Sequence, residues 1–577
     1  MIGVALDPEP TIKGRCPKTV AALVAPCLLF LVLALPFLDH PADTWEWLSL
    51  AAARQVLATG VPAVVGDERD GNHAVRPLLI HPPSSAHLMA SFLMVLGDAP
   101  WAARLSGVLV AVVTALALAR LVFTLSSGDR VVAARAAVLA AWLYLLHPAT
   151  LQGALYLGFS DGTLLPLSWV VFLLGWTWAM TRPTRTRILV GGIGLACALW
   201  AKITTSVALP AVVGLVLLAS ERLVPALTLA AGTIGLGLGL FLATWSAYVL
   251  YVSSAVGQPA ASVWADPFQY AFAEMNAAPS ATELGVAVAR VLLFLGPFLL
   301  VAAAVATGRR LARSVRERRV AWDALIPLLA TAVLVAYIAV PGGVGGFPKY
   351  HLVALPLLAA LAAEELAHAR PGRRALVLVV LALAYQLWLV GDPLKLLNHD
   401  LRAARLEGDA SSVLRVLALV VVLSALLPVA LHLASRGWRD AVLTAILGSH
   451  LALILLQASG GYFLKHWYGT PVEDFRRVVA LIRAETPPAS AILALPEFGY
   501  HSRRRIVPGA GRHTWGDARA IEALVRGSAP SAVVYGLPTH TVVQMRGLST
   551  DPALASTLGR GYRRIDVGEF TVWLPAS

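Results

Sequence analysis

Long apolar stretches recur along the first ~460 residues of the chain and are separated by short polar or basic turns. A helix that crosses a bilayer needs about 20 mostly apolar residues. Stretches that reach or approach this length lie at 18–37, 100–124, 131–147, 162–180, 188–201, 203–220, 224–251, 286–307, 322–340, 351–369, 375–391, 412–434 and 441–460. The pattern therefore predicts a polytopic α-helical membrane protein with roughly thirteen transmembrane helices.

Basic residues collect in alternate turns between these stretches. The clusters lie at 13–18, 182–187, 309–319, 370–374 and 436–439. Because Lys and Arg are retained in cytoplasmic loops, these positions predict a cytoplasmic N-terminus. An odd number of crossings then places the C-terminal region on the outer side of the membrane.

The turns predicted to face outward are longer and chemically mixed. The first, 39–99, contains amphipathic stretches at 45–57 and 84–96, and the loop 252–285 contains another at 268–275. These stretches are too short and too polar to cross a bilayer, so we expect helices that lie in the membrane interface. Long loops of mixed composition commonly carry function.

Beyond about residue 466 the pattern changes to an alternation of short elements. The expected elements are helices at 471–484 and 517–525 and strands at 491–495, 532–535 and 571–574. This alternation predicts a small soluble α/β domain at 461–577, which follows a transmembrane domain at 1–460. The segment contains neither a glycine-rich phosphate loop nor a nucleophile elbow.

Composition supports the membrane interpretation. Hydrophobic residues make up 58% of the chain, charged residues only 14%, and the mean hydropathy is +0.72. Soluble proteins carry about 25% charged residues. The net charge of +13 is explained by basic cytoplasmic loops, since no basic face is interleaved with aromatic residues as nucleic-acid binding requires. Cys16, Cys27 and Cys197 have no metal-binding spacing.

Acidic residues stand close to the predicted membrane boundary, where an ionised side chain is costly. Asp39, Asp43 and Glu46 follow the first apolar stretch, and Asp161 begins the fourth. Asp43 and Asp161 are each placed where a carboxylate can cap a helix, which is the structural alternative. We favour a shared site in which these carboxylates divide general-base and positioning roles. They permit a divalent metal ion without requiring one.

A second set of ionisable residues is cationic and lies on the predicted outer side, against the usual charge bias. Its members are Arg76, His81, Lys202, Lys349, His351, Lys395 and Arg402. An anionic substrate explains such a set, because Arg and Lys hold phosphate through charge-assisted hydrogen bonds. The alternative is that some of these side chains extend to lipid head groups.

Short motifs accompany these charged residues. His-Pro-Pro at 81–83 is followed by Ala-Ala-Arg-Leu at 102–105, and 348–356 has the sequence PKYHLVALP. Together with Asp161 and the turn at Lys202, this ordered set resembles the GT-C membrane glycosyltransferases. The similarity is to the branch that contains the aminoarabinose transferases and the protein O-mannosyltransferases.

The resemblance implies transfer of a sugar from a polyprenyl-phosphate-linked donor to a lipid, glycan or protein acceptor at the outer face of the cell membrane. A single displacement would invert the anomeric configuration. The adjacent acids of the family's first loop are spread apart here, which leaves the base open between Asp43 and Glu46. Asp39 is a secondary candidate, and Asp161 would position the acceptor or support the base.

The same resemblance implies that the cationic residues bind the phosphate of the donor. Lys202, His81 and Lys349 would stabilise charge on the departing lipid phosphate, with His351 and Arg76 as further donor-binding residues. Two other functions fit a polytopic chain: a transporter or lipid-linked-sugar flippase, and a membrane-anchored receptor or assembly module. A transporter predicts charges near the bilayer midplane and matching halves, whereas these residues are expected at one face and the sequence has no matching halves.

Overall fold

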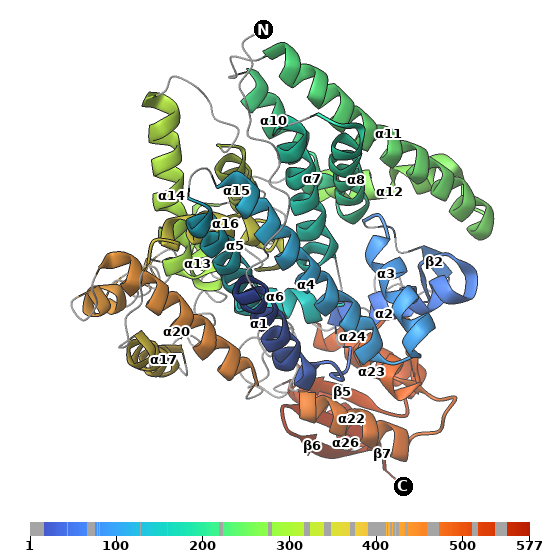
Figure 1. Cartoon of the computed structure of the whole chain (residues 1–577). Coiled ribbons are helices and arrows are strands. Elements are labelled where there is room, and N and C mark those ends of the chain that lie inside the picture. Colours follow the sequence, from blue (N-terminus) through green and yellow to red (C-terminus); the bar gives the residue numbers. More distant parts are fainter. Residues whose placement is uncertain are drawn as a thin grey trace.

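A computed structural model of the chain has a large body of helices, with a small sheet at one end (Figure 1). The residues that the structure describes are 17–42, 44–65, 75–77, 79, 81–126, 129–157, 160–181, 183–218, 223–274, 280–316, 324–339, 348–369, 375–390, 411, 414–415, 418, 422, 426–432, 437–458, 472–510, 517–536, 548 and 551–576.

The first half of the helical body follows the predicted apolar stretches, except that the helix at Pro148–Leu155 lies outside them. Its helices are α1 (Pro17–Ala34), α4 (Pro100–Leu125), α5 (Arg130–Leu145), α6 (Pro148–Leu155), α7 (Leu164–Thr181), α8 (Arg185–Ala201), α9 (Ile203–Ser206), α10 (Ala208–Leu218) and α11 (Leu223–Val256). Helix α8 packs between α7 and α11, and α4 packs against α5 and α7. The buried apolar side chains of these helices form one continuous core.

Glycines allow α7 and α8 to touch backbone to backbone. A Cβ atom added at Gly175 would overlap the backbone of Gly191, and one added at Gly194 would overlap the backbone of Phe172. Small residues permit this close approach where lipid supplies no hydrophobic driving force between helices. This close contact fixes the position of α8, which ends at Ala201 with Lys202 as its C-cap residue.

Among the described residues of the second half, one predicted stretch is broken, and the predicted stretch at 412–434 lies only partly within them. The helices of this half are α13 (Ala281–Leu295), α14 (Pro297–Arg316), α15 (Leu325–Ala339), α16 (Leu355–Leu366), α17 (Ala375–Val390) and α20 (Trp438–Ala458). The predicted single span at 286–307 is wrong, because the chain breaks between α13 and α14. Gly296 has a φ of 77°, and Pro297 supplies no N–H with which to continue the first helix.

Within the described part of the chain, three helices are long and apolar enough to cross a membrane: Pro100–Leu125, Leu164–Thr181 and Leu227–Val256. The pair α5 and α6, bent by 60° at the break between them, adds a fourth if it is counted as one span. The figure of roughly thirteen spans therefore remains a prediction.

The loop 39–99, which we call the first outer loop after its predicted side, contains the two predicted amphipathic helices. They are α2 (Thr44–Thr59) and α3 (Ser84–Leu96), and they pack against each other and against the start of α4. Between them lies an antiparallel pair of strands that the pattern did not predict, β1 (Ala63–Val65) and β2 (Val75–Pro77). The stretch predicted at 268–275 belongs to a longer helix, α12 (Ala260–Glu274).

The C-terminal region has its own hydrophobic core, in which Phe475, Phe498 and Phe570 pack together. Its elements are α22 (Val472–Glu485), β3 (Ala491–Ile492), α23 (Pro496–Ser502), β4 (Arg505–Ile506), α24 (Ala518–Ser528), β5 (Val533–Gly536), α26 (Pro552–Gly559), β6 (Tyr562–Val567) and β7 (Phe570–Pro575). The order β5-β7-β6 is antiparallel throughout. The α/β prediction is confirmed for this region, while the predicted boundary at 460/461 lies outside the described residues.

Candidate active site

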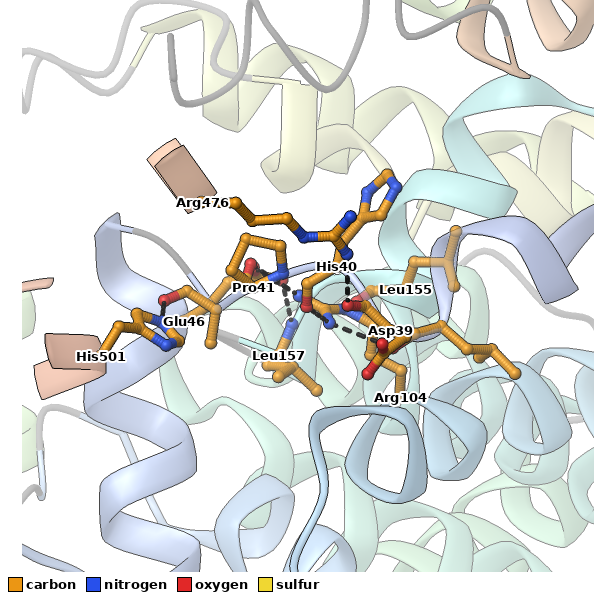
Figure 2. A network of polar contacts seen from close by, with 11 residues as sticks. Asp39, His40, Pro41, Glu46, Arg104, Leu155, Leu157, Arg476 and His501 are labelled. Atoms are coloured by element: carbon orange, nitrogen blue, oxygen red, sulfur yellow. Dashed lines mark hydrogen bonds and ion pairs between the residues drawn. The ribbon is translucent and has the colours of Figure 1, made fainter. Parts of the chain in front are cut away.

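Arg104 is the centre of a buried polar cluster that holds the beginning of the first outer loop. It lies one turn into α4 and is only 3% exposed. Its guanidinium donates hydrogen bonds to the carbonyl oxygens of Leu38 (3.2 Å), His40, Pro41 (3.4 Å) and Leu155 (3.0 Å) (Figure 2). The same group forms an ion pair with Glu46, whose Oε2 lies 2.9 Å from Nη2. The fixed fork of the guanidinium suits this multiple contact.

A glycine brings the partner carbonyl within reach of Arg104. Gly107 follows one turn later on α4, and a Cβ atom there would overlap the carbonyl oxygen of Ala154 on α6. Helix α6 therefore ends directly against α4, and Arg104 reaches the carbonyl of Leu155.

Residues 38–42, which we call the entry segment, lead into α2 and have no regular secondary structure. Besides the bonds from Arg104, the carbonyl of Asp39 accepts a hydrogen bond from Arg476 of α22 (3.1 Å). The carbonyl of Ala42 accepts one from His501 of α23 (Figure 2). Side-chain donors therefore contact the backbone carbonyl of every residue in the segment.

The predicted acids of the first loop have different surroundings. Asp43 lies outside the described residues, directly after the entry segment and before the first residue of α2. Glu46 is buried, and its Oε1 accepts a hydrogen bond from the backbone N–H of Leu157 (3.0 Å) while Oε2 faces Arg104. Asp39 has an exposed side chain. Glu46 is thus a paired carboxylate within the fold.

Asp161 and Lys202, predicted to share a site, form a buried ion pair with Nζ 2.7 Å from Oδ1. Asp161 lies in the short 3-10 helix η2 (Ser160–Gly162), where Gly162 is in backbone contact with Gly153 of α6. Lys202 stands in extended backbone between α8 and α9. Both side chains are 4% exposed, so each charge offsets the desolvation of the other.

Two aromatic rings lie beside the ammonium group of Lys202. Its Nζ lies 4.1 Å from the ring centre of Tyr350 and 5.4 Å from that of Tyr337, which adds cation–π attraction. His351 lies next to Tyr350 in η4 (Pro348–His351), with its ring 6.1 Å from that of Tyr337. His351 is 1% exposed, and neither ring nitrogen has a hydrogen-bond partner among the described residues.

The two clusters are joined by one stretch of chain, from the end of α6 to η2. Its residue Leu155 contacts Arg104, Leu157 contacts Glu46, and Asp161 contacts Lys202.

The other predicted site residues are placed only in part. His81 is half-buried just before α3. Only the backbones of Arg76, in β2, and Lys349, in η4, are described, and Lys395 and Arg402 lie outside the described residues. Among the side chains that are described, no three His, Cys, Asp or Glu groups converge as metal ligands.

Sequence reasoning missed three residues that hold the entry segment. Arg104 was noted only as part of a motif, although a lone arginine near the start of an apolar helix signals a buried partner. Arg476 and His501 lie in the C-terminal region, more than four hundred positions from their carbonyl partners. The sequence carries no local signal for such contacts.

His501 and His40 are both held in the neutral form. The pKa of His501 is lowered from 6.5 to about 4, mainly by burial and also by the charges of Arg104, Arg483 and Arg54, while the bond to Ala42 opposes the shift. Burial, Arg104 and Arg476 likewise lower the pKa of His40 to about 4.

We compared the chain with known proteins to find those with a similar fold. No protein-family model matches the chain, and no curated protein matches it. Solved structures do match. ArnT from Cupriavidus metallidurans in the apo state has 17% identity and a TM-score of 0.59, over 97% of this chain and 98% of that one. The same protein bound to undecaprenyl phosphate has 16% identity and a TM-score of 0.59, over 97% and 99% of the two chains.

A third match is the archaeal oligosaccharyltransferase AglB from Archaeoglobus fulgidus, in complex with an inhibitory peptide and a dolichol-phosphate. It has 12% identity and a TM-score of 0.52, over 97% of this chain and 74% of that one. ArnT, an aminoarabinose transferase, and AglB are both members of the GT-C superfamily. The chain therefore shares the fold of these two proteins, and the likeness to ArnT covers nearly its whole length.

Proposed function

We propose that this protein is a glycosyltransferase that takes its sugar from a polyprenyl-phosphate-linked donor. The fold supports this, because structures of both similar proteins hold a polyprenyl-type lipid phosphate, undecaprenyl phosphate in ArnT and dolichol-phosphate in AglB. The observation that carries the proposal is the set of hydrogen bonds to the entry segment. Arg104, Arg476 and His501 donate these bonds to its backbone carbonyl groups just before Asp43, and precise positioning of a reacting group requires such contacts.

We assign the general base to Asp43. Glu46 is the poorer candidate, since one of its oxygens faces the guanidinium of Arg104 and the other accepts the N–H of Leu157. Asp43 would take the proton of the acceptor hydroxyl while that oxygen attacks the anomeric carbon. The bond from this carbon to the phosphate oxygen breaks on the opposite face, so the anomeric configuration inverts.

We assign binding of the donor phosphate to Lys202 and to the other cationic residues predicted with it. The ammonium group has three N–H donors and directs one hydrogen bond to Asp161, so Asp161 orients the lysine. His351 lies next to Tyr350 in η4, its ring nitrogens have no hydrogen-bond partner among the described residues, and it would supply a further donor. His81, Lys349 and Arg76 complete the proposed set, and its charge would stabilise the leaving lipid phosphate.

The predicted topology supports a reaction in which the acceptor meets the donor on the outer side of the membrane. The distribution of basic turns predicts that the first outer loop and the C-terminal domain lie on the outer side of the cell membrane. An acceptor hydroxyl of a lipid, glycan or protein would meet the donor there, while the polyprenyl tail stays in the bilayer.

The proposal is tested by reconstituting the full-length protein in liposomes with polyprenyl-phosphate-linked sugars and an extract of envelope acceptors. Asp43→Asn should lower the rate of transfer at least 100-fold, as expected for loss of a general base. Asp566→Asn is the matched control, because Asp566 lies on β6, outside the proposed site, and forms a half-exposed ion pair with Arg564. Near-normal transfer by a folded Asp43→Asn protein would reject the assignment.

The same assay separates the flippase alternative. A flippase moves the intact lipid-linked sugar between leaflets and leaves the bond between sugar and phosphate unbroken. Release of free polyprenyl phosphate in step with a new glycosidic bond is expected only from a transferase.

A further inference from the structure

The C-terminal domain contacts the first outer loop through α23, which lies against α2 (Figure 1). The ring of Tyr500 lies 5.6 Å from the ring of Trp47, and Arg54 donates a hydrogen bond to the Tyr500 hydroxyl. Arg54 in turn pairs with Asp98 at 2.6 Å. The domain is therefore docked beside the residues that follow Asp43.

We propose that the C-terminal domain is part of the active site, because His501 and Arg476 position the entry segment that presents Asp43. This inference rests on the proposed function, in which Asp43 is the base. His501 and Arg476 act through the backbone of the loop and are positioning residues.

The entry segment depends on outside donors for its shape. It forms neither helix nor strand, so its carbonyl groups are not satisfied by a regular ladder of backbone bonds. Arg104 holds the carbonyls of Leu38, His40 and Pro41 from the helical body. The carbonyls of Asp39 and Ala42 are the remaining two, and the C-terminal domain supplies the donors for both.

His501 is suited to hold the last carbonyl before Asp43. A carbonyl oxygen can only accept, so Nε2 of the imidazole must carry the proton in this contact. The ring meets the rings of Phe475 (5.3 Å) and Tyr500 (5.1 Å) edge to face, at 88° to each. These contacts fix the direction of the N–H and therefore the position of Ala42.

Two substitutions at one position separate the hydrogen bond from the ring. His501→Phe keeps an aromatic ring against Phe475 and Tyr500 but removes the donor. His501→Gln keeps an N–H at a similar distance from the backbone. We expect His501→Phe to lower kcat for transfer about tenfold, with KM for the donor lipid within about twofold, because a misplaced base affects the reaction more than binding. His501→Gln should restore kcat to within about threefold of the wild type.

A second pair of variants tests the other contact and does not involve His501. Arg476→Gln shortens the side chain that reaches the carbonyl of Asp39 and should lower kcat three- to tenfold. Arg477→Gln is the matched control, since the neighbouring arginine pairs with Asp474 within α22 and has no bond to the entry segment. It should leave kcat unchanged.

Hydrogen exchange in the full-length protein gives a readout that does not need activity. Amides of residues 42–46 should exchange at least tenfold faster in His501→Phe than in the wild type or in His501→Gln. If the wild-type protein transfers no sugar, the proposed function fails, and the exchange rates still decide whether His501 holds the loop. Wild-type exchange and kcat in both His501→Phe and Arg476→Gln would overturn the inference, as would equal losses in His501→Phe and His501→Gln.

Discussion

At the scale of single residues, the structure shows the surroundings of Glu46, one of the two carboxylates between which the sequence left the base open. Glu46 has both oxygens engaged inside the fold, and Asp43, which lies outside the described residues, directly follows the entry segment. Proximity in sequence placed both acids in the first loop. It could not show that an arginine 58 positions away would pair with one of them, because that contact arises only when α4 packs against the loop.

Glu46→Gln should therefore act on stability. It leaves the guanidinium of Arg104 buried without a carboxylate, and breaking a buried ion pair costs about 3–5 kcal/mol. We expect a lower midpoint of thermal unfolding in detergent, measured by tryptophan fluorescence. Glu485→Gln is the control, because Glu485 and its partner Arg563 are both largely exposed, and its cost should stay below about 1 kcal/mol. Equal stabilities of the two variants would contradict the role assigned to the Glu46 pair.

At the scale of elements, periodicity and apolar length predicted most helices within a few residues. The exceptions have physical causes. The stretch at 286–307 was uniformly apolar, so its length concealed the break that Gly296 and Pro297 impose. Strand β6 was missed because its sequence, YRRIDV, is charged and largely exposed, and its pairing with β7 decides its conformation.

Basic turns also do more than orient the helices. Arg309 and Arg439, on α14 and α20, both pair with Glu365 of α16, at 2.6 and 2.9 Å. Arg310 pairs with the adjacent Glu364. Charge bias predicts on which side such arginines lie, but their partners come from packing.

The close contact of α7 and α8 gives a prediction at this scale. Gly175→Ala places a methyl group into the backbone of Gly191, and such overpacking costs about 1–3 kcal/mol. Unfolding in a mixed-micelle titration should show this loss. Gly214→Ala in α10, where a Cβ atom meets nothing within 4 Å, should be neutral or slightly stabilising. A stable Gly175→Ala protein would mean that the two helices are farther apart than described.

At the scale of the whole molecule, two bodies with separate hydrophobic cores meet at the entry segment. The core of the helical body runs from Cys27 to Ile446, and that of the C-terminal region from Phe475 to Leu574. The spacing of hydrophobic residues differs between the two parts of the sequence, and this difference predicted both bodies. It gave no indication that they share a polar contact, since the bond between His501 and Ala42 joins residues 459 positions apart.

The docking of the C-terminal domain should depend on pH. Burial, with nearby arginines, lowers the pKa of His501 from 6.5 to about 4, so docking favours the neutral imidazole. The stabilisation is fully present above pH 6.5 and is lost as the pH falls toward 4, because undocked His501 then binds a proton. Hydrogen exchange of 42–46 should accelerate over this range in the wild type. In His501→Gln, the part of this acceleration that is due to His501 should vanish. A part due to His40 should remain, because the pKa of His40 is also lowered from 6.5 to about 4. Identical pH profiles in the two proteins would contradict a contribution from His501.

The most direct test of the central claim is made in cells. Mass spectrometry of surface glycans, glycolipids and glycoproteins compares the parent strain, a strain lacking the protein, and that strain carrying wild type or Asp43→Asn. The account predicts that one sugar modification disappears on deletion, returns with the wild-type protein, and does not return with Asp43→Asn. Glycan profiles that are identical with and without the protein would contradict it.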